Sequence, residues 1–502
     1  MKTAISIILS ALFLALSAGA QTKQADYTAA LEVLNLDDMR TSLLAAGDHG
    51  LQPKWYWTDS MESEYSISGP LSAPLKEKTK VAFLRYLQHL NSGAVNPETL
   101  GAEFKVRRKW MVDSKQLSVM MLAQGSNAQS LVDSIAPTNA PYRALQTALR
   151  RLNDICGAGE WMAVPNPKKA LKLGSQDAIL PAIKTRLRQL GYNIATIDEL
   201  YDQQTVAAVN DIQATLRYRP DAVISPNGRT WKYLNTSCAS RIEQIKVDME
   251  KLRWFPRDFG DRYIYVNLAM TYLTLMDKEA GTVQVMRTIN GRTARKSPTL
   301  VDKITYVVVN PFWVVPPTVF REDKLSDLRG LSPWQVEGYF NKYHYEVWNK
   351  SFTRRMSPSA INWSWLDGDA DLYIRQKPGM HNALGVLKFM MTNDFAIYLH
   401  DTNQRELFKE YERQLSSGCV RVEKPYDLAE HLLRGTKWDR YALETQTAQP
   451  GQVLTKDTNV TLPQAMPVYM IFQPSQLSSD GIIRFAEDSY NQTERILSVQ
   501  RF

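Results

Sequence analysis

The spacing of hydrophobic residues changes near Arg262, and this change constrains the fold more than any other feature of the sequence. Before Arg262, apolar residues recur at helical intervals, as they do in residues 80–90 and 141–152. After it, short segments alternate between apolar and polar residues or are rich in β-branched residues, which is typical of strands: 263–268, 271–276, 282–289, 304–309, 386–391, 395–400, 466–472 and 481–485. One helix is expected among them, at 425–434. The sequence therefore predicts an α+β multidomain protein.

The first residues have the pattern of an export signal. Lys2 precedes an apolar run from Ala4 to Leu16 and a small-residue cleavage motif that ends at Ala20. We expect residues 1–20 to be a secretory signal peptide, since the run is too short to span a bilayer comfortably. No later segment is apolar for long enough to cross a membrane, so no stable membrane insertion is expected after cleavage.

Charge and cysteine content narrow the possible functions. The net charge of +8 would allow nucleic-acid binding, but the export signal argues against that partner and favours an acidic polymer of the cell envelope. The cysteines are Cys156, Cys238 and Cys419, and an odd count in an exported chain leaves at least one free thiol. Cys156 and Cys238 could form a disulfide or could be two buried thiols. No His/Cys cluster has metal-ligand spacing, so neither a metal nor another cofactor is expected.

The helical part of the chain divides into two expected domains. Residues 21–170 are predicted to form a scaffold of helices. Residues 171–236 have the spacing of a small three-helix module, with helices near 179–190, 205–216 and 225–235.

The β-rich domain is expected at residues 241–445. Within it, residues 321–372 form a Trp- and Tyr-rich insert of helical or irregular structure. Such an insert could be a lid over a substrate site or a structural flap. The strands within 446–502 are expected to return to the scaffold or to the β-rich domain.

One stretch combines the groups that a nucleophilic thiol needs: Tyr398-Leu399-His400-Asp401, followed by Ser416-Ser417-Gly418-Cys419-Val420-Arg421. Strand alternation places Tyr398 and His400 on one face and Asp401 on the opposite face. A thiol nucleophile needs a base that removes its proton, and His400 is the candidate. Because Asp401 points away, a backbone carbonyl is expected to orient the imidazole ring.

The same nucleophile needs backbone amides that hold an oxyanion. The amides of Ser417 to Cys419 could converge on one oxygen, because Gly418 permits a turn that other residues resist. The alternatives to a catalytic role are that Cys419 is a buried structural thiol and that His400 is a residue of the core.

These residues resemble the signature of L,D-transpeptidases of the YkuD type, in which a His is followed by a spacer and then by Ser/Thr-His-Gly-Cys. Fifteen residues separate His400 from Ser416, as in that signature. Further segments resemble the large YcbB-like branch of the family in the same order: 249–254, 309–317, 376–389 and 400–402. One position departs from the signature, because the His before Gly-Cys is Ser417 here, which removes a second imidazole from beside the thiol.

The resemblance implies roles for individual residues. Cys419 would be the nucleophile and His400 the general base, with Ser417 and Gly418 in the oxyanion loop. Tyr398 and Arg421 would contact the substrate, Arg421 through a carboxylate. Core packing is the alternative for Tyr398, and a structural salt bridge is the alternative for Arg421.

The resemblance also implies an architecture. Residues 241–445 would be a YkuD-like catalytic domain with an aromatic lid, and residues 171–236 would be a peptidoglycan-binding-like domain behind a helical scaffold. The usual Asp-Gly before the last helix of that module is Asp221-Ala222 here. A helical spacer that does not bind glycan is therefore the alternative for this module.

The implied function is a periplasmic peptidoglycan L,D-transpeptidase that carbapenems acylate. It would join donor and acceptor tetrapeptide stems by 3→3 cross-links through a cysteine thioester. The same acyl-enzyme could instead be resolved by water, as in an L,D-carboxypeptidase or endopeptidase, or by the lysine of an envelope lipoprotein. A catalytically inactive peptidoglycan-binding scaffold is the non-enzymatic alternative. The sequence does not indicate protein partners.

Overall fold

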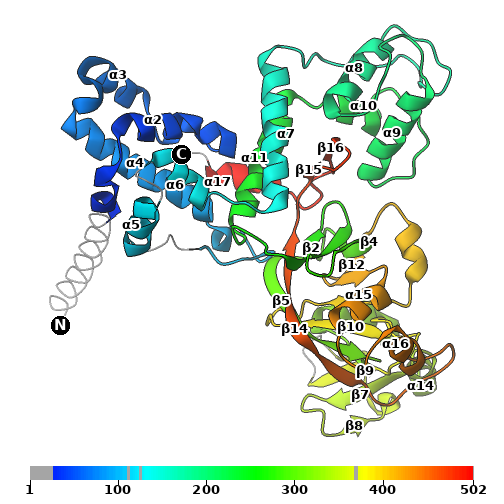
Figure 1. The fold of residues 1–502 in the computed structure, drawn as a ribbon. Helices are drawn as coiled ribbons and strands as arrows, with labels where there is room; N and C mark the ends of the chain where they lie inside the picture. The colour runs from blue at the N-terminus through cyan, green and yellow to red at the C-terminus, as the bar shows by residue number, and fades with distance from the viewer. Residues whose placement is uncertain (1–26, 110–113, 124–126, 367–370, 501–502) are drawn as a thin grey trace, which may run out of the picture. The chain divides into compact units, whose positions relative to one another are not determined.

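The computed structural model describes residues 27–109, 114–123, 127–366 and 371–500 (Figure 1). The expected signal peptide lies outside these residues. The chain divides into two compact units. The first contains the residues up to Leu216, Pro220–Phe259 and the residues from Pro474 onward, and the second contains Arg217–Arg219 and Gly260–Gln473. Within the described ranges, every helix is too short or too polar to span a bilayer.

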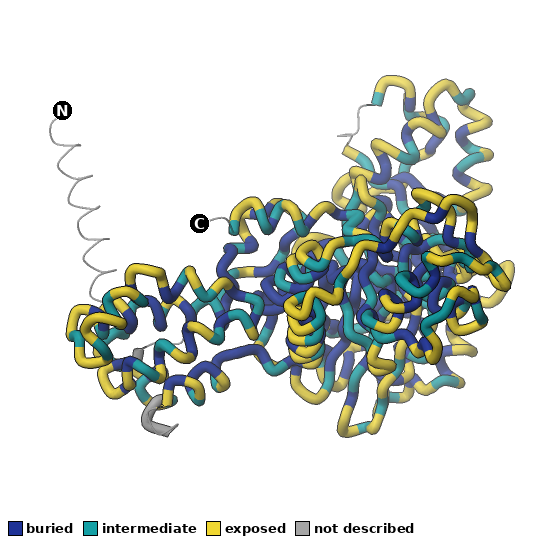
Figure 2. The backbone as a smooth tube through the Cα atoms, turned by 90° about the horizontal axis from the view of Figure 1, so that it is seen from above, coloured by how far each residue is buried: buried dark blue, intermediate teal, exposed yellow. Residues whose placement is uncertain are grey.

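The first unit begins with helices packed around an apolar core. Their bounds are α2 Leu36–Leu44, α3 Asp59–Ser68, α4 Ala73–Ser92, α5 Ser114–Ala123 and α6 Ala128–Ile135. Leu43 of α2, Phe83 of α4 and Leu131 of α6 are fully buried in this core. The predicted helix at 80–90 lies inside α4 and is confirmed. Figure 2 shows the resulting alternation of buried and exposed stretches along these helices.

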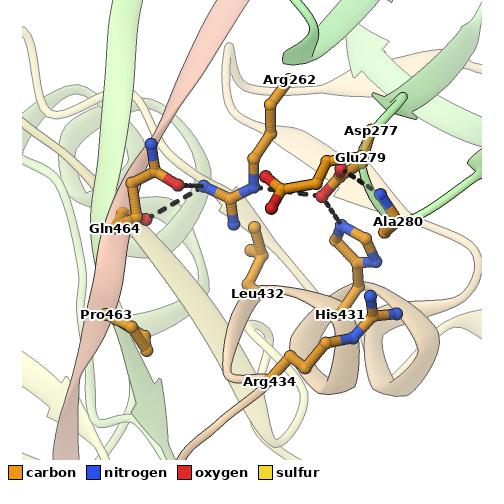
Figure 3. A pocket seen from close by; sticks show the side chains of 9 residues that line it. All are labelled: Arg262, Asp277, Glu279, Ala280, His431, Leu432, Arg434, Pro463 and Gln464. Carbon is orange, nitrogen blue, oxygen red and sulfur yellow. Dashed lines mark hydrogen bonds and ion pairs between the residues drawn. The ribbon is translucent and has the colours of Figure 1, made fainter.

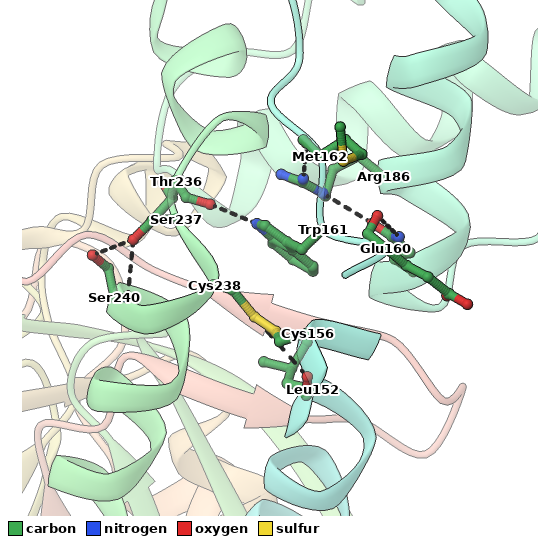
Figure 4. The surroundings of a disulfide bond; sticks show 11 residues. Leu152, Cys156, Glu160, Trp161, Met162, Arg186, Thr236, Ser237, Cys238 and Ser240 are labelled. Atoms are coloured by element: carbon green, nitrogen blue, oxygen red, sulfur yellow. Dashed lines mark hydrogen bonds between the residues drawn. A yellow bond between two sulfur atoms is a disulfide. The ribbon is translucent and has the colours of Figure 1, made fainter. Parts of the chain in front are cut away.

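Two longer helices of the first unit are joined by a disulfide. They are α7 (Ala140–Gly157), which contains the predicted helix at 141–152, and α11 (Cys238–Arg253). The side chain of Asn139 accepts a hydrogen bond from the amide of Tyr142 and caps α7. Cys156, near the end of α7, is bonded to Cys238, at the start of α11 (Figure 4). Of the two possibilities left open for these cysteines, the structure shows the disulfide.

The three-helix module lies in the chain segment between the two bonded cysteines. Its helices are α8 (Leu180–Leu190), α9 (Gln203–Thr215) and α10 (Arg229–Leu234), in agreement with the predicted segments. One buried charge of this module is paired, since the ammonium of Lys184 contacts Asp198 at 2.7 Å and Asp202 at 2.6 Å. The first unit is completed by β15 (Ser475–Leu477), β16 (Ile483–Phe485) and α17 (Gln492–Gln500).

The second unit is built on a sheet that closes on itself. Its strands are β2 Arg262–Asn267, β3 Tyr272–Asp277, β4 Thr282–Gly291, β5 Thr299–Val309, β10 Leu387–Met391, β11 Leu399–His400, β13 Val420–Val422 and β14 Thr458–Ile471. The order of neighbours is β5-β10-β11-β13-β4-β3-β2-β14, and β14 pairs back with β5. A short strand, β12 (Gln414–Ser416), pairs with β4. The helices α15 (Pro425–Leu432) and α16 (Arg440–Gln446) follow β13.

One predicted strand is much shorter than expected. The segment 395–400 is reduced to β11, Leu399–His400. The side-chain oxygen of Asn393 accepts hydrogen bonds from the amides of Phe395 and Ile397. These bonds form a turn where the alternating pattern predicted a ladder.

The prediction of a helical or irregular insert is wrong in part. Residues 321–372 do contain helices, α13 (Leu325–Leu328) and α14 (Pro333–Lys342), and α12 (Pro317–Val319) precedes them. They also contain strands that belong to a second sheet with the order β6-β9-β7-β8. Its strands are β6 Trp313–Val314, β7 Tyr345–Asn349, β8 Arg355–Met356 and β9 Leu372–Gln376. The insert has a core of its own around Phe340, Val347 and Trp363.

Candidate active site

Two adjacent strands carry the predicted site residues. β11 and β13 are parallel, with Leu399 opposite Val420 and His400 opposite Arg421. Leu399 and Val420 are fully buried, and they point to the face opposite to their chain neighbours. The amide of Val420 donates to the carbonyl of Tyr398 at 3.2 Å, so Cys419 comes beside Tyr398. The structure thus brings Tyr398, His400, Cys419 and Arg421 to one face.

The candidate nucleophile is a free thiol. Cys419 lies outside the disulfide, and its sulfur contacts the carbonyl oxygen of Ala396 at 3.5 Å. Burial of the sulfur raises the pKa of the Cys419 thiol, and hydrogen bonding from Tyr398 and the nearby charges of Lys388 and Arg421 oppose this rise. The thiol is therefore the resting form, and any thiolate depends on these neighbours.

The candidate base is fixed in one tautomer. His400 is buried, and its Nδ1 lies 2.5 Å from the main-chain oxygen of Asp401. A carbonyl oxygen only accepts hydrogen bonds, so Nδ1 carries the proton and Nε2 has a lone pair. Burial lowers the pKa of His400 to about 3, and the charges of Arg421 and Lys388 act in the same direction. The ring is therefore neutral at neutral pH, and a backbone carbonyl orients it, as expected from the sequence.

The carboxylate of Asp401 serves a different purpose. It is buried, accepts a hydrogen bond from the amide of Val386 at 3.0 Å and pairs with Arg405 at 2.7 Å. Gly385 has a φ of 61°, and a Cβ atom there would lie 2.3 Å from the Asp401 carboxylate. Glycine is required at this position because only a residue without a side chain leaves room for Asp401. This contact accounts for one glycine of the motif at 376–389.

The loop before the nucleophile corrects one expectation. The Ser416 hydroxyl donates to the carbonyl of Cys419 at 2.6 Å and accepts from the amide of Gly418 at 3.1 Å. Gly418 has a φ of 122°, a conformation that glycine adopts readily. Its amide is already bonded within the turn, so it does not join the other two at a common oxygen. The amides of Ser417 and Cys419 remain the candidate oxyanion donors.

Ser417 is linked to the insert by an arginine that the sequence did not indicate. Arg295 donates to the Ser417 hydroxyl at 3.0 Å and pairs with Asp323 at 2.7 Å and with Glu322 at 2.5 Å. Ser297, two residues further on, donates to the carbonyl of Gly418 at 2.7 Å. The segment between β4 and β5 therefore buttresses the nucleophile loop and connects it to the insert.

Two cations complete the site. Lys388 lies opposite His400 in the sheet register, and its Nζ is 4.0 Å from the centre of the Tyr398 ring. Arg421 donates to the side-chain oxygen of Gln404 at 2.9 Å, and its Nε is buried with no partner among the described residues. The only sequence signal for Lys388 was its place in the segment 376–389.

One cavity of the second unit is lined by none of the predicted site residues. It has a volume of about 350 Å³ and is lined by Arg262, Asp277, Glu279, Ala280, His431, Leu432, Arg434, Pro463 and Gln464 (Figure 3). The Asp277 carboxylate is bonded to the amide of Ala280 at 3.0 Å, to Arg262 at 3.2 Å and to His431 at 2.9 Å. Arg262, Asp277 and His431 are therefore bonded to one another. Across the described ranges, no cluster of three or more His, Cys, Asp and Glu side chains could hold a metal.

Three family models match separate parts of the chain. A model described as "L,D-transpeptidase catalytic domain" matches residues 261–439. A model described as "Scaffold domain" matches residues 29–149, and one described as "Putative peptidoglycan binding domain" matches residues 177–232.

Among known proteins, a Haemophilus influenzae protein named "Putative L,D-transpeptidase" is 31% identical over 256 residues. The match covers 51% of this chain and 49% of that relative, so the chain spans about half the length of the protein it matches.

Solved structures were also matched. An L,D-transpeptidase from Xylanimonas cellulosilytica is 13% identical, with a TM-score of 0.20, and covers 61% of this chain and 100% of its own. One from Stackebrandtia nassauensis is 11% identical, with a TM-score of 0.19, and covers 61% and 97%. TM-scores this low support no inference, and the assignment rests on the family models and the sequence relative. The chain contains a YkuD-type L,D-transpeptidase catalytic domain, joined to a scaffold domain and a peptidoglycan-binding module.

Proposed function

We propose that this protein is a peptidoglycan L,D-transpeptidase that forms 3→3 cross-links through a thioester on Cys419. The observation that carries the proposal is the pairing of a free thiol with a neutral imidazole on adjacent strands, the imidazole being held with Nε2 as its acceptor. A thiol and a base on one face are what nucleophilic acyl transfer requires. The match to the catalytic-domain model supports peptidoglycan as the substrate class.

In the first half-reaction, His400 Nε2 takes the proton of Cys419 as the sulfur attacks the donor stem. The bond attacked is the amide between the diamino acid at position three and D-Ala at position four. The amides of Ser417 and Cys419 hold the oxyanion that forms. The proton on His400 then passes to the departing D-Ala amine, which leaves a thioester on Cys419.

In the second half-reaction, the side-chain amine of an acceptor stem attacks the thioester. His400 takes a proton from the amine, the carbon–sulfur bond breaks, and the sulfur leaves as a thiolate that is then reprotonated. Tyr398 lines the pocket. Arg421 binds a stem carboxylate with the guanidinium atoms that Gln404 does not occupy.

The proposed partner and compartment follow from the same features. Peptidoglycan tetrapeptide stems are donor and acceptor, and the module at residues 177–232 supports retention on that polymer. The disulfide between Cys156 and Cys238 favours an oxidising compartment outside the cytoplasm. Together with the expected signal peptide, this supports a periplasmic location.

Purified muropeptides test the reaction. We expect the protein to convert tetrapeptide monomers into dimers whose mass equals two monomers less one D-Ala, and the Cys419→Ala variant to produce none. A carbapenem should add one drug mass to the wild type and nothing to Cys419→Ala. A Cys156→Ser/Cys238→Ser variant retains Cys419, so labelling should persist in it.

The alternatives give different products. Trimmed monomers without dimers would indicate hydrolysis in place of transfer, and products that need an added lipoprotein would indicate a ligase. A folded wild-type protein that forms neither an adduct nor any product would be a binding scaffold, and the proposal would be wrong.

A further inference from the structure

Lys388 is a half-buried cation on the same face as the candidate nucleophile. Its strand β10 pairs with β11, and Lys388 lies directly opposite His400. The ammonium lies 4.0 Å from the centre of the Tyr398 ring, which holds it over the site by a cation–π contact. Among the described residues, no carboxylate lies within salt-bridge distance of Lys388. The charge therefore has no permanent counter-ion, which is unusual for a lysine with so little exposure.

The nucleophile also lacks an obvious counter-ion. In many cysteine enzymes a protonated histidine stabilises the thiolate. Here burial keeps the pKa of His400 at about 3, so the ring is neutral and carries no compensating charge. A thiolate in this desolvated position must be stabilised by other groups.

Few groups face the sulfur from the surrounding strands. β11 contributes Tyr398, which donates a hydrogen bond, and the neutral His400. β13 contributes Arg421, which donates a hydrogen bond to Gln404 and is also attracted electrostatically by Glu406. β10 contributes Lys388, whose charge lowers the pKa of the Cys419 thiol, and Lys388 in turn is attracted by Cys419 and by Asp457. Of the two cations, Arg421 has a hydrogen-bonded side-chain partner, whereas the described residues provide none for Lys388.

We propose that Lys388 is a positioning residue whose ammonium stabilises the Cys419 thiolate. The counter-ion of the thiolate is then a lysine ammonium and not an imidazolium. When the thiol ionises in the free enzyme, the sulfur–hydrogen bond breaks, the proton leaves to solvent, and the electron pair stays on the sulfur beside the ammonium. This inference deepens the proposed function and rests on Cys419 being its nucleophile. The Tyr398 ring fixes the distance at which the lysine acts.

The test measures the ionisation of Cys419 without any peptidoglycan. Cys156 and Cys238 are bonded to each other, so iodoacetamide under non-reducing conditions alkylates Cys419 alone. The alkylation rate is followed by intact mass as a function of pH. We expect Lys388→Met to move the midpoint upward by about 1 pH unit or more, because a nearby opposite charge shifts a pKa by this amount.

Three further variants make the result specific. Lys388→Arg keeps the charge and should restore most of the wild-type midpoint. Lys303→Met removes one exposed lysine from β5 of the same unit and should leave the midpoint unchanged. Lys388→Gln is the second neutral variant if Lys388→Met does not fold, as judged by circular dichroism and melting temperature.

The inference fails if a folded neutral variant has the wild-type alkylation profile, or if Lys303→Met shifts it equally. Because no substrate is present, this failure is distinct from that of the proposed function. An altered profile in a protein that does not cross-link muropeptides would uphold the role of Lys388 toward the thiol and refute the transpeptidase. If instead the protein cross-links muropeptides and a folded neutral variant keeps the wild-type alkylation profile, the transpeptidase is upheld and the role of Lys388 is refuted.

Discussion

Ala222 occupies a backbone conformation that alanine adopts only at a cost. Its φ is 54°, and it stands where the resemblance to peptidoglycan-binding domains leads us to expect the Gly of an Asp-Gly pair. Hydrogen bonds hold it there, since its amide donates to Gln213 at 3.0 Å and its carbonyl accepts from Tyr201 at 2.7 Å. The left-handed region costs a residue with a Cβ atom about 1–2 kcal/mol. The departure from the family pattern has therefore kept the turn and introduced strain.

Replacing Ala222 with glycine should remove that strain. We expect Ala222→Gly to raise the free energy of unfolding by about 1 kcal/mol, part of the gain being offset by the greater freedom of glycine in the unfolded chain. Urea denaturation measures the change. Ala207→Gly is the matched control, because Ala207 is exposed on α9 and glycine there should lower stability by about 1 kcal/mol. A loss of stability in both variants would contradict the interpretation.

For single residues, the sequence predicts the placements that follow from alternation within one strand. Alternation placed Tyr398 and His400 on one face, and the motif added Cys419, although the structure was needed to show that the strands are neighbours. Lys388 and Arg295 were not identified, because one reaches the site through the register of a third strand and the other through a loop contact. Register and loop packing depend on residues far apart in the chain.

Among the secondary-structure elements, the insert and the nucleophile loop are joined by one ion-pair network. The side chain of Arg295 is only 10% exposed, and its guanidinium contacts both Asp323 and the Ser417 hydroxyl. A buried guanidinium with two kinds of partner restricts both of the segments that it joins. The position of the insert is therefore coupled to that of the residues around Cys419.

A double-mutant cycle measures this coupling. Arg295→Ala and Asp323→Ala should each destabilise the protein, and the double variant should be less destabilised than their sum by about 1 kcal/mol. The free energy is obtained from urea unfolding. The control cycle uses Lys278 and Asp261, which are 2.7 Å apart with side chains 64% and 74% exposed, and should show coupling near zero. If the effects of Arg295→Ala and Asp323→Ala are strictly additive, the two side chains have no coupling free energy and the interpretation is wrong.

The second sheet could not be read from the sequence for a related reason. Its strands are two to five residues long, too short for periodicity to distinguish a strand from a loop. β6 pairs with β9, although the whole insert separates them in the chain. By contrast, β2 to β5 are long and joined by short turns, and their predictions agree with the structure.

For the whole molecule, we expect buried and half-buried histidines to contribute to the loss of stability in acid. Burial lowers the pKa of His49 to about 3 and that of His89 to about 4, as it lowers that of His400. In the unfolded chain these groups titrate near 6.5. The unfolded state therefore binds more protons between pH 6.5 and about 4, and stability is lost as the pH falls through this window.

We expect each of these histidines to remove about 2 kcal/mol of stability between pH 7 and pH 5. Urea unfolding at several pH values gives the slope. His89→Gln should flatten it, because glutamine does not titrate, whereas His344→Gln at a partly exposed position is the matched control. The prediction is wrong if the slope of His89→Gln equals that of the wild type.

The disulfide constrains the first unit by closing a long loop of the chain. Its cysteines are 82 positions apart, and closing a loop of this length stabilises a fold by about 2–4 kcal/mol. We expect Cys156→Ser/Cys238→Ser to lower the free energy of unfolding by this amount. Reducing agent should do the same to the wild type and have no effect on the variant. Equal stability of the two proteins under oxidising conditions would refute the prediction.

The closed sheet of the second unit sets an order on biosynthesis. β14 pairs with both β2 and β5, although it ends at Ile471 and they lie far upstream. A ribosome delivers the upstream strands first, so the nascent chain carries two unpaired strand edges until β14 has emerged. Such edges associate readily with other chains. We therefore expect a chain truncated after α16 to self-associate, because the native unit is complete only once β14 has been synthesised.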